Sequence, residues 1–263
     1  MISVEQRFYH AFPAFAEGTA RAFSRPVIDL LRRIVCEERV NQTLRTLHES
    51  HGFDFVEAAL DHLQQTYRVG HQDRANIPSE GRVVIVANHP LGAIDALALL
   101  HLVGSVRRDV KVLANDVLMS LTPLRDLLLP IDVFGEAESP SGLRAAFRAL
   151  EQEQALIVFP AGEVSRIRPN GVRDGRWSAG FLRFAKRMGA PVVPVHIAAH
   201  NSPLFYGLSM LAKPLATLML PREMFKTERR NMCLTVGAPI STVSLSPERL
   251  NERQVAQRMR AHV

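Results

Sequence analysis

From Arg82 onward, short runs of β-branched apolar residues alternate with longer segments of helical periodicity, and this alternation constrains the fold most strongly. The run 82–88 (RVVIVAN) is apolar almost throughout, as is typical of a strand buried on both faces of a sheet. The predicted strands are 82–88, 110–114, 131–134, 155–159, 192–197 and 232–236. The predicted helices are 93–103, 119–129, 142–152, 178–188 and 247–261. The alternation predicts an α/β fold with a mostly parallel central sheet flanked by helices.

The residues before this region read mainly as helices. Apolar residues recur at helical spacing across 27–35, and a second helical stretch extends from Phe53 to Tyr67. The segment 76–81 contains Pro78 and Gly81 and reads as a linker. We therefore expect an N-terminal helical membrane-contact segment at 1–76, followed by an α/β domain at 77–263.

Composition and charge narrow the class of partner. Apolar residues make up 47% of the 263 residues, which is enough for a substantial core. The formal net charge of +6 favours anionic partners such as nucleic acid, lipid headgroups or phosphorylated ligands. Aromatic residues are only 6% and no nucleic-acid-binding motif is present, so we expect no nucleic-acid partner.

Cysteine usage and hydropathy bear on the compartment. Cys36 and Cys233 are the two cysteines and neither belongs to a C-x-x-C pair, which is typical of reduced thiols in a cytosolic protein. Charges interrupt residues 1–25, so no signal peptide is expected. No transmembrane helix is predicted. We expect a protein of the cytoplasm, or one that lies on a membrane without crossing it.

The first chemical candidate is the segment from Asn88 to Asp95 (NHPLGAID), which directly follows a predicted strand. In parallel sheets, ligands gather at the carboxyl ends of the strands. His89 could accept a proton from an attacking hydroxyl while Asp95 holds the imidazole tautomer. The alternative is a capping or core histidine. His48 and Asp54 share the same offset, so the position of His89 after a strand, rather than the spacing, favours catalysis.

The second candidate is the segment from Phe159 to Arg166, which also follows a predicted strand. Gly162 allows a close backbone approach, and neighbouring amides could cradle an anion. Arg166 could bind phosphate or carboxylate through its planar fork. The alternative is an ordinary turn with surface charge. The basic stretch continues through Arg168, Arg173 and Arg176, which equally suits a solvated loop.

Together the two candidates resemble the glycerophospholipid acyltransferase superfamily, which includes the lysophosphatidic acid acyltransferases. That family carries an N-H-x4-D block, a middle block with Arg, an F-P-E-G-T-R block and a proline-centred strand. Counterparts occur here in the same order at Asn88–Asp95, Pro130–Phe134, Phe159–Arg166 and Pro191–Val195, within residues 82–240. The motifs NHPLGAID, FPAGE and PREMF more closely resemble the branch that carries the hemolysin label, which includes lyso-ornithine lipid acyltransferase domains.

The resemblance implies roles for individual residues. His89 is implied as the general base and Asp95 as its orienting partner. Gly162 and Glu163 are implied to shape the acceptor or thioester site, and Pro194 to set the floor of the pocket. The full set of expected substrate-binding residues is Asn88, Gly92, Asp132, Gly162, Glu163, Ser165, Arg166 and Pro194.

The resemblance also implies a reaction. A fatty acyl group would pass from an acyl carrier protein or coenzyme A thioester to the hydroxyl of a lysolipid, either lyso-ornithine lipid or a lysophospholipid. The absence of a G-x-S-x-G elbow favours direct attack without an acyl-enzyme. No cofactor is required, and no metal site is expected because 48–51 (HESH) lacks H-E-x-x-H spacing. The expected location is peripheral, on the anionic cytoplasmic face of the inner membrane.

Three departures from the family pattern affect these expectations. The first block has H-x5-D spacing, one residue longer, and we hypothesise that Gly92 absorbs the extra residue as a bulge. Ala161 stands where the family has Glu, while Glu163 stands where it has Thr. The middle block keeps Asp132, but Val133 replaces the Arg. The loss of that phosphate ligand argues against a simple glycerol-phosphate acceptor.

Two apolar stretches could hold or reach lipid. Segments 119–129 and 203–220 carry few charges and suit an acyl pocket or a membrane-dipping face, with ordinary core as the alternative. Four N-terminal arginines that could bind anionic lipid are Arg21, Arg25, Arg32 and Arg33. The main rival to an enzyme is a non-catalytic lipid-binding or hemolysin-type membrane protein on the same fold. The presence of both His89 and Asp95 favours the enzyme.

Overall fold

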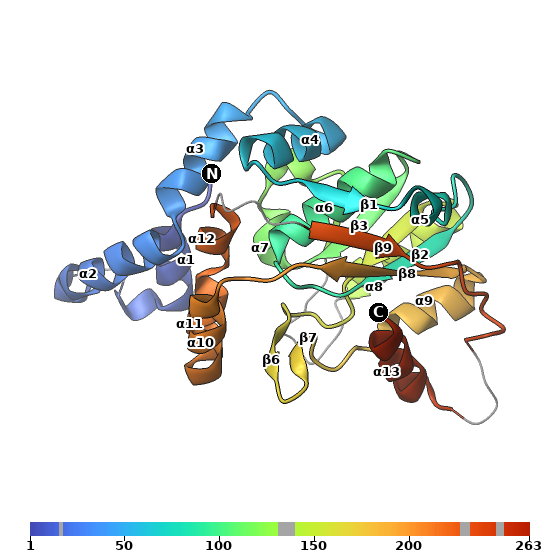
Figure 1. Ribbon diagram of the computed structural model, residues 1–263. Coiled ribbons are helices and arrows are strands. Elements are labelled where there is room, and N and C mark those ends of the chain that lie inside the picture. The colour runs from blue at the N-terminus through green and yellow to red at the C-terminus, as the bar shows by residue number, and fades with distance from the viewer. Residues whose placement is uncertain (16–17, 131–139, 227–231, 246–249) are drawn as a thin grey trace. The chain divides into compact units, whose positions relative to one another are not determined.

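The computed structural model describes residues 1–15, 18–130, 140–226, 232–245 and 250–263, and Figure 1 gives the path of the chain. The chain divides into two compact units. Unit 1 comprises Met1–Glu49 and Asn201–Lys226, and unit 2 comprises Ser50–His200 and Thr227–Val263. Both candidate motifs belong to unit 2. The membrane-contact role expected for residues 1–76 stays a prediction.

Unit 2 is built on a seven-stranded sheet with the order β1-β9-β8-β2-β5-β3-β4. Its strands are β1 (Tyr67–Val69), β2 (Val83–Ala87), β3 (Val110–Ala114), β4 (Leu128–Pro130), β5 (Ala155–Val158), β8 (Val192–Ala198) and β9 (Met232–Val236). Neighbouring strands pair in parallel except β8 with β9, which are antiparallel. Strands β6 (Arg166–Arg168) and β7 (Gly171–Arg173) form a separate antiparallel hairpin. The predicted mostly parallel α/β architecture is confirmed.

Both units contain helices. Those of unit 2 are α4 (Gly52–His62), α5 (His71–Ala75), α6 (Ala93–Gly104), α7 (Asp116–Met119), α8 (Pro140–Glu151), α9 (Gly180–Met188) and α13 (Glu252–His262). Those of unit 1 are α1 (Val4–Ala11), α2 (Gly18–Ile34), α3 (Glu37–Thr46), α10 (Pro203–Leu211), α11 (Lys213–Leu218) and α12 (Leu220–Met224). Within the described ranges, none of these helices has the length and hydropathy to span a membrane.

The centre of the sheet is the most deeply buried part of unit 2. All five side chains of β2 are fully buried, which explains the uninterrupted apolar run in the sequence. Val84 and Val86 belong to one core cluster with buried residues of α8, α9 and α13. Helix α6 packs against β3 and α4. The neighbouring strands β2 and β5 therefore present their carboxyl ends at one edge, where both candidate motifs begin.

The predicted helix at 119–129 is wrong. Helix α7 ends at Met119, a single 3₁₀ turn spans Thr122–Leu124, and Leu128–Pro130 pairs with β3 as strand β4. Pro123 cannot donate a backbone hydrogen bond inside an α-helix, and a short apolar run does not by itself distinguish a helix from a buried strand. The predicted strand at 131–134, with Asp132, lies outside the described residues.

Two helix ends also differ from expectation. The helix beginning near Phe53 ends at His62, because Gln64 adopts a φ of +52° and Tyr67 then enters β1 beside β9. The last helix begins at Glu252 rather than near residue 247, because the Asn251 side chain caps it by accepting from the Gln254 amide. Residues 247–249 lie outside the described ranges.

Candidate active site

The Asn88 side chain fixes the point where the chain leaves β2. Its amide donates to the carbonyl of Ile197 at 2.9 Å, and its oxygen accepts from the Ile197 amide at 2.6 Å. Through these two bonds, the Asn88 side chain continues the hydrogen bonding between β2 and β8 past the end of β2. The His89 backbone amide donates to Oδ1 of Asp174 at 3.1 Å. The residue that carries the imidazole is thus held from both the sheet and the loop around Asp174.

Gly92 makes the turn that joins His89 to helix α6. Its φ of +90° and ψ of −128° belong to a region that side chains with a Cβ rarely occupy. The turn brings Asp95 back toward the strand end, where Oδ2 accepts from the amides of Leu91 at 2.7 Å and Gly92 at 3.0 Å. The conformation of Gly92 fits the hypothesis that it absorbs the additional residue of the H-x5-D spacing.

His89 and Asp95 form a buried acid–imidazole pair. Nδ1 of His89 lies 3.2 Å from Oδ2 of Asp95, and the two side chains are 19% and 0% exposed. Burial raises the pKa of the Asp95 carboxyl, while the imidazole and the amides of Leu91 and Gly92 act in the opposite direction. Because Nδ1 lies beside the buried carboxylate, Nε2 is the ring nitrogen that could accept a proton from a substrate. A His–Asp pair of this kind suits general-base catalysis.

The two candidate motifs meet at His89. The Phe159 ring, directly after β5, lies 4.3 Å from the His89 ring at an interplanar angle of 34°. The Ser165 amide donates to the His89 carbonyl at 2.8 Å. Gly162 adopts a φ of +67°, and its amide bonds to the Phe159 carbonyl at 3.1 Å, so a tight turn separates these two contacts. The structure thus places side by side two segments that are about seventy residues apart in the chain.

Asp174 organises this junction, and the sequence interpretation missed it. Its Oδ1 accepts from both the His89 amide and the Ser165 hydroxyl, the latter at 2.5 Å. Its Oδ2 accepts from the indole Nε1 of Trp177 at 2.8 Å. Asp174, Ser165 and Trp177 are all buried. The only local signal was an Asp three residues before the single Trp of the chain, inside a stretch where the arginines drew attention.

Asp174→Ala is expected to destabilise unit 2. The change leaves buried donors on His89, Ser165 and Trp177 without their acceptor, and we expect a loss of about 2–4 kcal/mol in the free energy of unfolding. Urea unfolding followed by circular dichroism measures this loss. Asp61→Ala, at an exposed position on α4, is the matched control and should change the free energy of unfolding by less than about 0.5 kcal/mol. Equal midpoints for the two variants would contradict the organising role of Asp174.

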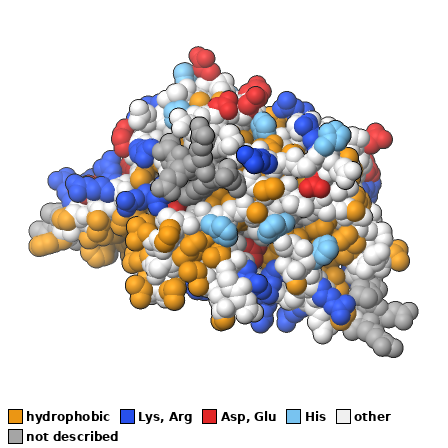
Figure 2. All heavy atoms as spheres, viewed as in Figure 1, with side chains coloured by type: hydrophobic (Ala, Val, Ile, Leu, Met, Phe, Trp, Pro, Cys, Tyr) orange, Lys and Arg blue, Asp and Glu red, His pale blue; other side chains and the backbone are white. Residues whose placement is uncertain are grey.

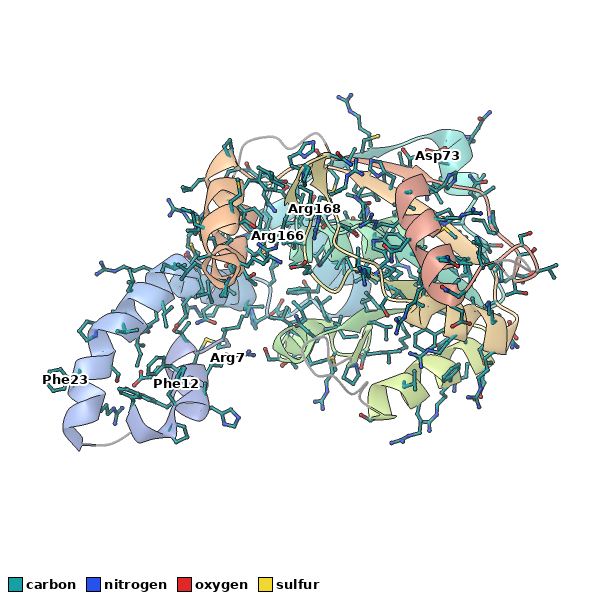
Figure 3. All side chains as sticks on the ribbon, turned by 90° about the horizontal axis from the view of Figure 1, so that it is seen from below. Arg7, Phe12, Phe23, Asp73, Arg166 and Arg168 are labelled. Atoms are coloured by element: carbon teal, nitrogen blue, oxygen red, sulfur yellow. The ribbon has the colours of Figure 1, made fainter. Side chains whose placement is uncertain are left out.

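Arg166 is engaged inside the protein. It is buried, and its Nε donates to Oε2 of Glu163 at 3.2 Å, while Arg168 approaches the other Glu163 oxygen at 3.8 Å. Figure 3 labels both arginines on strand β6. Neither Glu163 nor Arg166 is among the residues that line the cavity beside His89. Their expected contact with substrate stays a prediction, and their observed role is to brace the loop after β5.

A cavity of about 1320 Å³ opens beside the pair, and among the predicted site residues it is lined by His89 and Gly162. Its apolar wall includes Val112, Leu113, Leu128, Leu143, Phe181 and Phe184. Part of the apolar stretch 119–129 thus contributes to the cavity through Leu128. Pro194 lies elsewhere, in β8, and a Cβ at Gly237 would come within 2.9 Å of its Cγ. The pocket-floor role expected for Pro194 also stays a prediction.

Comparisons with known proteins agree with this geometry. The model of the acyltransferase family matches residues 13–262. The lyso-glycine lipid O-acyltransferase of Bacteroides thetaiotaomicron is 37% identical over 224 residues, covering 81% of this chain and 80% of that protein. The protein of the same name from Phocaeicola vulgatus is 32% identical over 223 residues, covering 81% and 78%.

A solved structure supports the fold. The crystal structure of the 1-acyl-sn-glycerophosphate (LPA) acyltransferase of Thermotoga maritima aligns with a TM-score of 0.51 at 20% identity, covering 80% of this chain and 76% of that one. The expectation of an enzyme rather than a non-catalytic protein on this fold is confirmed by the family match and the two relatives. The chain belongs to the acyltransferase family, within the glycerophospholipid acyltransferase superfamily, and is an O-acyltransferase.

Proposed function

We propose that this enzyme transfers a fatty acyl group from a thioester to the hydroxyl of a lysolipid with an amino-acid headgroup, with His89 as general base. The observation that carries the proposal is the buried pair of His89 and Asp95, 3.2 Å apart, beside a large and partly apolar cavity. The apolar wall can hold a fatty chain, and the imidazole can take the proton from an attacking alcohol.

The mechanism is a direct attack. Nε2 of His89 takes the proton of the lipid hydroxyl as the oxygen forms a bond to the thioester carbonyl carbon. The Asp95 carboxylate stabilises the imidazolium that results. The tetrahedral intermediate then breaks its carbon–sulfur bond, and the departing thiolate takes the proton back from His89. Cys233 is exposed on β9, and neither it nor Cys36 lines the cavity, which supports transfer without an acyl-cysteine.

The proposed acceptor class rests on sequence likeness. The two relatives at 37% and 32% identity are named for lyso-glycine lipid, and the NHPLGAID and FPAGE wording resembles lyso-ornithine lipid acyltransferases. Val133 stands in place of a family arginine, which favours an acceptor without a glycerol phosphate. We therefore rank lyso-glycine lipid first, lyso-ornithine lipid second and lysophosphatidic acid last. The proposed donor is an acyl thioester of acyl carrier protein or coenzyme A.

Lipid analysis tests this ranking. Wild type and His89→Ala are expressed in the same host, and extracted lipids are compared by mass spectrometry after feeding each lysolipid. We expect the doubly acylated amino-acid lipid to accumulate only with wild type. Accumulation of phosphatidic acid, with no change in amino-acid lipids, would overturn the proposed acceptor class while leaving the acyltransferase activity in place.

We also propose that unit 1 contacts an anionic membrane surface, at the cytoplasmic face of the inner membrane. On α2, Phe23, Val27 and Leu30 follow one another at helical spacing and are all exposed. Further exposed apolar side chains of unit 1 are Phe12, Phe15, Leu204, Met210, Leu211 and Leu215. Figure 2 shows hydrophobic side chains gathered over the helices of unit 1, and Figure 3 labels Phe12 and Phe23 there.

Basic residues accompany these apolar side chains. Arg21, Arg25, Arg32 and Arg33 are exposed on α2, and Arg21 and Arg32 are also ion-paired, with Glu5 and Glu37 respectively. A helix with apolar and basic residues of this kind suits the interface of an anionic membrane. The expected segments 1–76 and 203–220 both contribute to this face through the residues of unit 1.

The double variant Phe12→Glu/Phe23→Glu should weaken binding to vesicles that contain anionic lipid by about tenfold or more, because two apolar anchors are replaced by charges that the surface repels. Flotation at low salt measures the bound fraction. Val243→Glu, at an 83% exposed position of unit 2, is the matched control and should bind like wild type. Full binding by the double variant would contradict the proposed membrane face.

A further inference from the structure

The cavity beside His89 has a second, basic part. Four arginines line it, namely Arg176, Arg183, Arg253 and Arg258. All four side chains belong to exposed residues, and no Asp or Glu occurs among the described residues that line the cavity. The apolar wall comes from β3, β4, α8 and α9, and the arginines come from the loop before α9, from α9 and from α13. We call these four residues the arginine rim.

Buried contacts hold the elements that carry the rim. Val255 and Met259 of α13 belong to the same core cluster as Trp177 and Phe181. The Gln257 side chain donates to the Trp177 carbonyl at 2.8 Å. Arg260, which does not line the cavity, donates to the carbonyl of Gly175 at 2.9 Å. Helices α9 and α13, labelled in Figure 1, therefore carry Arg183, Arg253 and Arg258 on a packed part of unit 2.

The acidic residue at the start of α13 forms an ion pair with a lysine. Glu252, the acidic residue at the start of α13, pairs with Lys186 of α9 at 3.2 Å. Neither residue lines the cavity. The cavity thus combines an imidazole base, an apolar wall and four arginines, with no Asp or Glu among the described residues that line it. A neutral acyl chain accounts for the wall, but it does not account for four guanidinium groups.

We propose that the arginine rim binds the phosphate of the phosphopantetheine arm through which the acyl donor carries its thioester. This inference rests on the proposed function. Acyl carrier protein and coenzyme A share this arm, whose phosphate lies at the end remote from the sulfur. A donor in the cavity would place its chain against the apolar wall, its carbonyl beside His89 and its phosphate at the rim. The planar fork of arginine suits phosphate oxygens, with which it forms paired charge-assisted hydrogen bonds.

The double variant Arg253→Gln/Arg258→Gln tests the rim, with Arg148→Gln, on the exposed part of α8 and away from the cavity lining, as the matched control. We expect KM for acyl-coenzyme A and for acyl carrier protein thioester to rise by about 10–100-fold, as for lost hydrogen bonds to a charged group, with kcat and acceptor KM within threefold. Acyl-pantetheine, which has no phosphate, should react equally with wild type and the double variant. Calorimetry should give a matching loss of affinity for free coenzyme A.

These outcomes test phosphate binding by the arginine rim independently of the proposed function. Unchanged donor KM and unchanged coenzyme A affinity would overturn the rim, even where His89→Ala abolishes transfer. A rise in acceptor KM instead of donor KM would also overturn it, since the rim would then serve the acceptor headgroup. A loss confined to coenzyme A would assign the rim to nucleotide phosphates and contradict binding of the shared arm. Loss of coenzyme A affinity in a protein that transfers no acyl group would support the rim and sink the proposed function.

Discussion

His89→Ala is expected to lower kcat for acyl transfer by about 10²–10⁴-fold, because it removes the base that takes the proton from the acceptor hydroxyl. The imidazole packs against Phe159 and is 19% exposed, so its loss leaves the main core intact. Release of free thiol from the acyl donor, followed in the presence of lysolipid, measures kcat. Circular dichroism of the variant should match that of wild type.

The chain offers a control for this variant. His48 and Asp54 share the His–Asp offset, but the His48 side chain is 71% exposed in unit 1. We expect His48→Ala to keep full activity. If kcat of His89→Ala stayed within tenfold of wild type, or if the two histidine variants lost activity equally, the assignment of His89 as base would be untenable.

Asp95→Asn is expected to lower kcat by roughly 10³–10⁴-fold, as an amide in place of the orienting carboxylate does in serine-protease triads. The amide no longer stabilises an imidazolium, and its NH₂ group can turn the His89 tautomer so that Nε2 carries the proton. KM should change little, because the Asp95 side chain is 0% exposed and does not line the cavity. Steady-state kinetics with both substrates varied separates these two parameters.

The pH dependence of the Tm tests separately whether Asp95 is a buried carboxyl with a raised pKa. Burial raises the pKa of Asp95 above its ordinary value of 3.8, so the folded protein holds this proton more tightly than the unfolded chain. Wild type therefore loses stability from this group as pH rises from the ordinary value through the raised one, and the asparagine variant does not. We expect the Tm of Asp95→Asn, relative to wild type, to increase with pH over that window. A relative Tm that falls as pH rises would contradict the buried-carboxyl account.

The strands that the sequence predicted best are longer than the ones that it missed, at five residues each. Strand β2 at Val83–Ala87 and strand β9 at Met232–Val236 lie within one residue of their expected ranges. Strands β1 and β4 are three residues each and depend on pairing with other strands, β9 and β3 respectively. A three-residue strand carries too little periodicity of its own, so local sequence favoured helix in both places.

The residues of the candidate site likewise fall into two classes, those that local sequence identifies and those that only the fold brings together. His89, Asp95 and Gly162 follow strand ends in recognisable blocks, and local sequence was enough to select them. Asp174 bonds to the backbone of His89 across 85 positions, a contact set by the fold rather than by a motif. Arg253, likewise, reaches the cavity only because α13 packs beside α9. Residue type alone also cannot tell an arginine that binds substrate from one paired internally.

The most direct test of the account is a single-turnover reaction with purified enzyme, labelled acyl thioester and lyso-glycine lipid, in which quenched samples are examined for labelled lipid and labelled protein. The account predicts that ester product appears without any acylated protein, and that His89→Ala forms product at least about a hundredfold more slowly. Labelled protein formed before the product, or an undiminished rate in the variant, would contradict direct attack assisted by His89.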